Sequence, residues 1–392
     1  MTNNNSNYIS NLTAMRGIAA LLTVLFHVDL MLSNGQGMLI KHSTSLIMTR
    51  FYLMVDFFFI LSGFIMVHVY GQWFSEKVTG SEFWRFTRAR FARVYPLHLV
   101  TLLYIIAVFT VSAQLGVPKV PVLQIENHGY SIATNLLLLQ SMNMHNWFSW
   151  NHAAWSISTE WWMYMLFPFL VRPFLKLTYW SRAAVAVLCF LGYAAIMFWI
   201  IPIVTYPPEI PFVKTDPATM TINVAYQFGF LRCMFGFVLG MMLYQGYKES
   251  WAKAWLSKGS VLLALTMGLF ASMHFNLTDI LTVSFFPFIL LSAAYGSESI
   301  NAFLQSKPLQ KLGDWSFSIY LMHQPLMFTI GAIMGYLNND KLAVAGPPPP
   351  PPDVITGWLI CFGVLALVLS VSWLTYRFLE VPARHWINPK KV

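Results

Sequence analysis

The chain has 392 residues, of which 57% are hydrophobic and only 10% are charged. A soluble globular domain carries about a quarter charged residues, so this composition excludes an ordinary water-soluble fold. The formal net charge of +9 does not indicate a nucleic-acid-binding protein, because the charges lie in short clusters between apolar runs. The N-terminal residues are polar and lack the basic start of a cleavable signal peptide, so the first apolar run is expected to stay in the membrane.

Ten apolar runs along the chain are long enough, or nearly so, to cross a membrane. A spanning helix needs about 20 mainly apolar residues. Because backbone groups in lipid must form their hydrogen bonds within the segment, these runs are expected to be helices. The sequence therefore predicts an all-α fold, a polytopic membrane helical bundle with about ten transmembrane helices, at 12–34, 46–71, 94–114, 155–172, 182–203, 223–246, 259–275, 279–296, 314–337 and 354–377.

The basic residues predict how these helices cross the membrane, since Lys and Arg concentrate in cytoplasmic loops. With the N-terminus inside, 18 of the 24 Lys and Arg residues fall on the cytoplasmic side and 5 outside, while Arg232 lies within a run. Both termini are therefore expected in the cytoplasm. The longest outside loop, about 115–154, and a polyproline spacer at 347–352 would lie on the opposite side. We expect a single membrane domain over 1–392, with a core at about 10–386 and no appended soluble domain.

The first run carries two ionisable residues, Arg16 and His27. They are eleven residues apart, so at about 100° per residue they return to nearly the same helix face, separated by roughly 16 Å of rise. Ionisable groups inside spans are costly and are candidates for function. The structural alternative is that Arg16 reaches toward the membrane surface and that a neighbouring helix hydrogen-bonds His27.

The second run and the segment after it add an acid and a basic cluster. Asp56 needs a partner, either His27 or an arginine, because a lone buried carboxylate is costly. The following Ser62 and Gly63 are small enough to let another helix approach closely. In the segment from 85 to 93, Arg90 and Arg93 share one helix face and could grip phosphates bidentately. The alternative is that this segment only anchors the chain to anionic lipid.

Three further candidates lie in later runs. Glu160 follows Trp155-Ser156-Ile157-Ser158-Thr159 and is either the structural partner of an arginine or a general base. Tyr320 and His323 are three residues apart and share a helix face. Each could equally be a packed hydrogen-bonding group. Metal binding is not expected, because the His and carboxylate residues lie on different runs and the three cysteines show no ligand spacing.

Together these segments resemble the acyltransferase-3 family of bacterial inner-membrane proteins. The resemblance runs from about residue 10 to 386 and rests on motifs that follow one another in the family's order. These are Arg16-x10-His27, the block from Asp56 to Phe64, Arg90-x-x-Arg93 with Tyr95-Pro96, Trp155 to Glu160, Ser318 to His323, and Glu380-Val381-Pro382-Ala383-Arg384.

The resemblance implies a glycan O-acetyltransferase type of enzyme in the bacterial inner (plasma) membrane. Such a protein moves an acyl group, usually acetyl, from cytoplasmic acyl-CoA to a hydroxyl of a cell-surface or exported polysaccharide or a lipid-linked saccharide. Acyl-CoA would be a donor substrate and not a permanently bound cofactor. Without an appended domain, the protein would pass the acyl group to the acceptor directly or to a separate glycan-assembly protein.

The residues then take expected roles in this reaction. Arg90 and Arg93, with Arg16, would bind the phosphates of CoA. His27 would be the general base, oriented by Asp56 or Glu160. The route could be direct attack by a sugar hydroxyl or a covalent acyl-enzyme on Tyr320 or on a histidine such as His323.

A transporter is the main alternative from another class, since membrane His, Asp and Glu also form proton relays. The chain shows no inverted repeat, however, and the Arg-rich segment suits a phosphorylated donor. A non-catalytic scaffold would leave the intramembrane ionisable groups unexplained.

Overall fold

The computed structural model describes residues 9–33, 39–209, 220–337 and 352–389. All regular structure in these ranges is helical, which confirms the predicted all-α fold. The long helices are α1 (Ser10–Ser33), α2 (Met54–Tyr70), α3 (Gly80–Gln114), α6 (Ala154–Leu175), α7 (Tyr179–Ala195), α8 (Gly229–Lys248), α10 (Gly259–His274), α11 (Asp279–Tyr295), α13 (Lys307–Leu337) and α15 (Val354–Thr375). The short elements are η1 (Met48–Leu53), η2 (Gly71–Phe74), α4 (Pro121–Gln124), α5 (Gly129–Leu136), η3 (Ile196–Ile200), η4 (Ile201–Ile203), α9 (Lys253–Leu256), α12 (Glu298–Leu304), η7 (Tyr376–Glu380) and α16 (Val381–Ile387).

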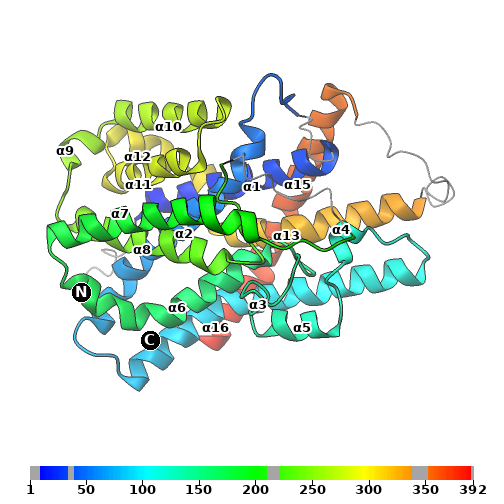
Figure 1. Ribbon diagram of the computed structural model, residues 1–392, viewed down its shortest axis with the longest axis horizontal. Coiled ribbons are helices and arrows are strands. Elements are labelled where there is room, and N and C mark those ends of the chain that lie inside the picture. Colours follow the sequence, from blue (N-terminus) through cyan, green and yellow to red (C-terminus); the bar gives the residue numbers. More distant parts are fainter. Residues whose placement is uncertain (1–8, 34–38, 210–219, 338–351, 390–392) are drawn as a thin grey trace.

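The long helices lie side by side as a bundle (Figure 1). Two pairs make its centre: α1 packs along α13, and α2 packs along α8. Helices α3 and α6 close one side, and α10, α11 and α12 lie on the other, where α11 packs against α1, α2 and α8. Helices α1 and α13 run parallel, because residue 310 bonds to residue 10 and residue 323 bonds to residue 27.

Glycines allow the central helices to touch backbone to backbone. A Cβ on Gly17 would lie 2.6 Å from the backbone nitrogen of Gly313, and one on Gly63 would collide with the carbonyl of Phe237. The close approach expected at Gly63 is therefore present, with α8 as the partner helix. Small residues at such crossings bring helices together where lipid provides no hydrophobic drive for association.

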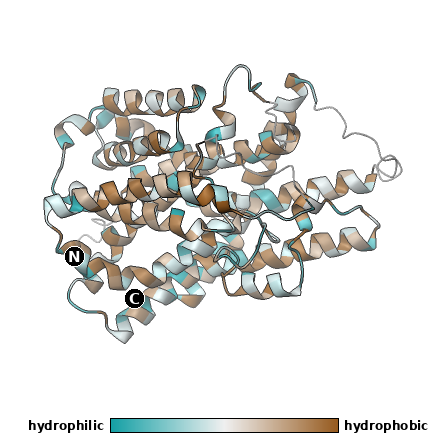
Figure 2. Cartoon of the chain, in the orientation of Figure 1, coloured by the Kyte–Doolittle hydropathy of each residue, from teal (hydrophilic) through white to brown (hydrophobic). Residues whose placement is uncertain are grey.

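Apolar side chains cover much of the outer surface. On α7, Leu188 and Leu191 are 60% and 58% exposed, and on α15, Ile355 and Leu359 are 74% and 67% exposed. Figure 2 shows hydrophobic residues along the long helices and many of the hydrophilic ones at helix ends and in loops. A soluble protein rarely exposes apolar surface on this scale, so these faces suit lipid.

Six helical segments in the described ranges are long and apolar enough to cross a membrane, and the bent pair of α11 and α12, with its angle of 99°, would make a seventh. The expected count of about ten is therefore not confirmed, although each of the ten runs coincides largely with helix. Helix α10 has only 16 residues. Helices α6 and α8 carry charged residues inside, Glu160 and Arg232, which lower their apolar character.

Helix α3 begins well before its apolar run. The side chain of Thr79 accepts the backbone N–H of Glu82 at 3.3 Å and caps the helix start, so the basic segment from 85 to 93 is helical as expected. The expected polyproline spacer lies outside the described residues except for Pro352.

Candidate active site

A cavity of about 140 Å³ lies between α1, α2, α3, α6 and α13. Five of the eight predicted site residues line it: Arg16, Arg90, Arg93, Glu160 and Tyr320. They come from four different helices, so the fold assembles groups that are far apart in the sequence. We call this space the arginine cavity.

Two of its three guanidinium groups are held firmly in place. Arg90 donates to the hydroxyl of Tyr70 at 2.6 Å and lies over the ring of the same residue. Arg93 pairs with Glu380, which is almost fully buried, and lies over the ring of Phe317. Arg16 contributes the third group and donates to the carbonyl of Gly313 at 3.2 Å. Fixed guanidinium groups around one cavity suit a ligand with several phosphates.

Glu160 lies beside the arginines of this cavity. Its carboxyl group interacts with the hydroxyls of Ser62 and Tyr164 and with the charges of Arg90 and Arg93. The two hydroxyls are themselves 3.1 Å apart. This position matches the expectation of a structural partner for an arginine more closely than that of a base beside a histidine.

Tyr320 connects the arginine cavity to a pair of histidines. Its hydroxyl lies 2.7 Å from Oγ of Ser156, and both residues line the cavity. On the other side of Tyr320, the ring of His323 has its centroid 5.9 Å away. His27 and His323 do not line the cavity, and Tyr320 is the lining residue whose ring contacts His323.

The two histidines contact each other directly. Nε2 of His323 lies 3.2 Å from Nδ1 of His27, which also lies 2.9 Å from the carbonyl oxygen of Thr23. A carbonyl only accepts, so Nδ1 of His27 must carry the proton and donate it. In a neutral ring this leaves Nε2 of His27 unprotonated, with a lone pair that can take a proton. His27 is therefore oriented by Thr23 and His323.

Asp56 has another role in the structure. Its carboxylate accepts two hydrogen bonds from Arg232, at 3.0 Å and 2.6 Å, and both side chains are fully buried. Arg232 also donates to Asn223 at 2.9 Å. The expectation that Asp56 needs a partner is met by an arginine, and this bidentate pair ties α2 to α8.

Glu380 and Arg232 are buried charged residues that contact predicted site residues but were not themselves predicted from the sequence. Glu380 pairs with both Arg93 and Arg384 and accepts a hydrogen bond from Ser318 at 2.8 Å. The sequence feature that could have identified Glu380 is the motif from Glu380 to Arg384 near the C-terminus. The signal for Arg232 was its position as the one basic residue well inside an apolar run.

A loop cluster of Glu126, His128 and His145 has the residue types of a metal site, with one ligand atom from each lying within 4.8 Å of the others. These atoms already bond to one another, because Oε2 of Glu126 lies 3.1 Å from each imidazole. Nδ1 of His128 also accepts the backbone N–H of Ser131, so its Nε2 carries the proton of the neutral ring. That nitrogen cannot also offer a lone pair to a metal. These hydrogen bonds among Glu126, His128 and His145 stabilise the fold of the loop.

Comparison with known proteins gives the chain its family. Residues 9–377 match the family model described as the acyltransferase domain. The chain is 28% identical over 363 residues to acyltransferase MdmB of Streptomyces mycarofaciens, covering 86% of this chain and 85% of that protein. It is also 36% identical over 107 residues to protein 2 in the picA locus of Rhizobium radiobacter, covering 27% of this chain and 49% of that protein. No solved structure shows a significant match. The chain belongs to the acyltransferase-3 family and is a membrane acyltransferase.

Proposed function

We propose that this protein transfers an acetyl group from acetyl-CoA to a hydroxyl of a cell-surface or exported polysaccharide. The observation that carries the proposal is the gathering of Arg16, Arg90 and Arg93 around one cavity, whose lining residue Tyr320 contacts the histidine pair. CoA carries a pyrophosphate and a 3′-phosphate, and three guanidinium groups offer matching charge. A thioester extending past Tyr320 would meet His27.

The proposed chemistry needs one base. Nε2 of His27 takes the proton of the acceptor hydroxyl while the oxygen attacks the thioester carbonyl. The new C–O bond forms, the C–S bond breaks, and the CoA thiolate leaves and recovers the proton from His27. The hydrogen bond from Nδ1 to Thr23 holds the ring in the tautomer that this step requires.

A covalent route through Tyr320 is the alternative within this function. Its hydroxyl bonds to Ser156 and lines the arginine cavity, so it could receive the acyl group before the acceptor does. The two routes differ in kinetics, because a covalent intermediate gives a burst of CoA release before acceptor is consumed. Direct attack gives none.

The proposed setting is the bacterial inner membrane, with both termini in the cytoplasm. The sequence placed 18 of 24 basic residues on that side. Gln310 bonds to Ser10, so α1 and α13 begin at the same side of the bundle. Glu380, near the end of the chain, accepts a hydrogen bond from Ser318 in the first half of α13, which supports placing both termini on that side. The donor would then enter from the cytoplasm, and the acceptor, or a glycan-assembly protein carrying it, from the opposite side.

The test is purified protein in lipid nanodiscs with acetyl-CoA labelled in the acetyl group. Free thiol is measured with a chromogenic reagent, and the label is followed into added saccharide. We expect thiol release that depends on His27. Wild-type protein that consumes no acetyl-CoA, yet consumes another acyl-CoA, would contradict the acetyl assignment. Wild-type protein that consumes no acyl-CoA at all would contradict the proposal.

A further inference from the structure

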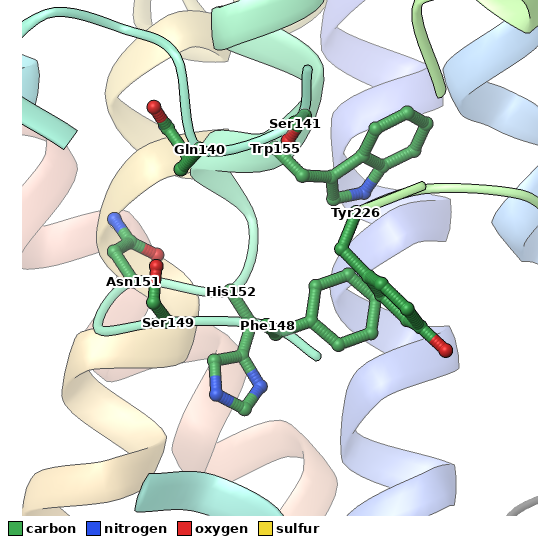
Figure 3. Close-up of a pocket in the computed structure, with 8 residues that line it drawn as sticks. All are labelled: Gln140, Ser141, Phe148, Ser149, Asn151, His152, Trp155 and Tyr226. Carbon is green, nitrogen blue, oxygen red and sulfur yellow. The ribbon is translucent and has the colours of Figure 1, made fainter. Parts of the chain in front are cut away.

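A second, smaller cavity lies at the start of α6, formed by the loop before that helix, by Trp155 and by Tyr226 (Figure 3). Three aromatic rings form one side of it, those of Phe148, Trp155 and Tyr226. Polar side chains, including Gln140 and Asn151, lie on the opposite side. We call this space the loop cavity.

Three buried polar atoms in its lining have no hydrogen-bond partner among the described residues. They are Oε1 of Gln140, Oγ of Ser141 and Oδ1 of Asn151. The side-chain nitrogens of the two amides are used, because Asn151 donates to the carbonyl of Leu321 at 3.0 Å and Gln140 to that of Ala154 at 3.1 Å. These bonds fix each amide with its oxygen free. The lining therefore offers acceptors to a group that donates.

Such orphaned atoms are unusual. A buried acceptor without a partner costs about 1–3 kcal/mol, so native proteins leave few of them. Gln140, Ser141 and Asn151 are 5%, 0% and 2% exposed, which makes bulk water a poor partner. Three in one cavity favour a ligand that brings a hydroxyl. Aromatic rings opposite polar groups suit a ring that has both apolar C–H faces and hydroxyls.

The size of the loop cavity limits what enters it. Its volume is about 10 Å³, which is room for one water-sized group such as a hydroxyl. A sugar ring does not fit inside. The ring would have to remain at the mouth while a single hydroxyl points inward.

The loop cavity lies against the same stretch of α13 that carries His323. Asn151 bonds to Leu321, and the ring of His152 lies 5.1 Å from that of Phe328. His323 falls between these two contacts in the sequence, while Tyr320, one turn earlier, lines the arginine cavity. His152 is also close enough to His27 to interact with its charge. Trp155 lines the loop cavity and the next residue, Ser156, lines the arginine cavity, so the two cavities are neighbours at the start of α6.

We propose that the loop cavity binds a hydroxyl of the acceptor next to the one that reacts, and that this acceptor is a saccharide ring. The inference rests on the proposed function and adds the acceptor's position to it. The single inward hydroxyl donates one hydrogen bond, to the free oxygen of Gln140 or Asn151, and accepts one from the hydroxyl of Ser141, while Phe148 and Tyr226 contact the ring at the mouth. A different hydroxyl of the same ring, outside the loop cavity, passes its proton to Nε2 of His27, its oxygen bonds to the acyl carbon, and the CoA thiolate leaves with the proton returned by His27.

The test separates acceptor binding from donor chemistry. Purified wild type, Asn151→Ala and Ser141→Ala are assayed with labelled acetyl-CoA, first without saccharide and then with a panel of methyl pyranosides of glucose, galactose, mannose, rhamnose and N-acetylglucosamine. Thioester hydrolysis without saccharide reports the donor side alone. Ser141→Ala removes only the unpartnered hydroxyl, so it preserves the fold even if Asn151→Ala does not.

We expect each variant to raise the KM for the accepted pyranoside about tenfold, while the KM for acetyl-CoA and the rate of hydrolysis stay within twofold of wild type. Gln227→Ala is the matched control, because Gln227 is a buried amide in a nearby segment that bonds to Thr205 and Asn146 but does not line the loop cavity.

Two results would overturn the inference. One is an unchanged saccharide KM in Ser141→Ala and in every folded Asn151 variant. The other is normal wild-type hydrolysis with transfer to none of the pyranosides. Failure of the proposed function itself looks different, because wild-type protein would then consume no thioester even without saccharide.

Discussion

His27 and His323 are in direct contact, with Nε2 of His323 lying 3.2 Å from Nδ1 of His27. Because Nδ1 of His27 also bonds to Thr23, its Nε2 remains as the nitrogen that can accept a proton. We therefore expect His27→Gln, which is similar in size but does not accept a proton at neutral pH, to lower kcat by about 10²–10⁴-fold. Acetyl-CoA binding should change little.

The measurement is turnover per folded molecule, with folded protein counted by size-exclusion chromatography. His323→Gln is the comparison, because that residue positions His27 and should cost less activity than the base itself. Substantial turnover by His27→Gln would remove His27 from the mechanism.

The arginine cavity predicts which arginines of α3 bind the donor. Arg90 and Arg93 line the cavity, whereas Arg85 lies over the ring of Trp73 and does not. We expect Arg90→Lys and Arg93→Lys to raise the KM for acetyl-CoA about tenfold or more, because an ammonium cannot reproduce bidentate phosphate contacts. Arg85→Lys is the matched control on the same helix.

Binding of CoA and of dephospho-CoA, measured by calorimetry, checks this prediction. If both ligands bind the Arg90 and Arg93 variants as tightly as they bind wild type, these arginines only anchor the helix to the membrane surface.

The buried pair of Asp56 and Arg232 should matter for stability. Removing one partner leaves an uncompensated charge, and for buried pairs this costs about 3–5 kcal/mol. Arg232→Leu should therefore lower the melting temperature strongly in detergent. The double variant Asp56→Leu with Arg232→Leu should recover much of the loss, since no charge is then stranded. A double variant less stable than Arg232→Leu would show that the charge on Asp56 has another compensating partner.

The two ends of α3 predict the topology of the protein. Lys77 precedes that helix, and Asn143 lies in the loop region beyond its other end, where it accepts the backbone N–H of Phe228 at 2.7 Å. Reporter fusions at these two positions should give opposite compartments, with Lys77 cytoplasmic. The same compartment for both would contradict the arrangement of donor and acceptor sides.

His152 predicts a pH effect on the loop before α6. Burial lowers the pKa of His152 to about 4, with smaller effects from its bond to Leu123 and the nearby His27. The unfolded chain has a histidine pKa near 6.5 and so binds more protons between these values. The contribution of neutral His152 to the free energy of unfolding is therefore fully present above about pH 6.5 and is lost as the pH drops toward 4. When the pH is lowered from 7.5 to 4.5, the melting temperature should fall less in His152→Gln than in wild type. Equal falls in melting temperature would exclude this residue as the cause.

The sequence predicted the helices better than the contacts between them. Apolar runs and the small Gly63 are local signals, and both were confirmed. The count of spans was not, since Glu160 and Arg232 make α6 and α8 too polar to be recognised as spans by composition.

The partners inside the site needed the fold. Arg232 lies 176 residues from Asp56, and His323 lies 296 residues from His27. The spacing of residues within one helix shows which face is buried, but it does not show which other helix packs against that face. Spacing alone could therefore place Arg16 and His27 on one face but could not say that a second histidine contacts His27.

The close approach of Gly17 and Gly313 sets the depth of the histidine pair. Each glycine precedes its histidine by ten residues, on helices that run parallel. Ten residues of helix rise about 15 Å, so each histidine lies about 15 Å along its helix from the point where the two glycines meet. Because the two offsets are equal, the imidazoles lie at the same height along the two helices. A single methyl group at either glycine would disturb this register and alter the catalytic geometry from a position that touches neither substrate nor base.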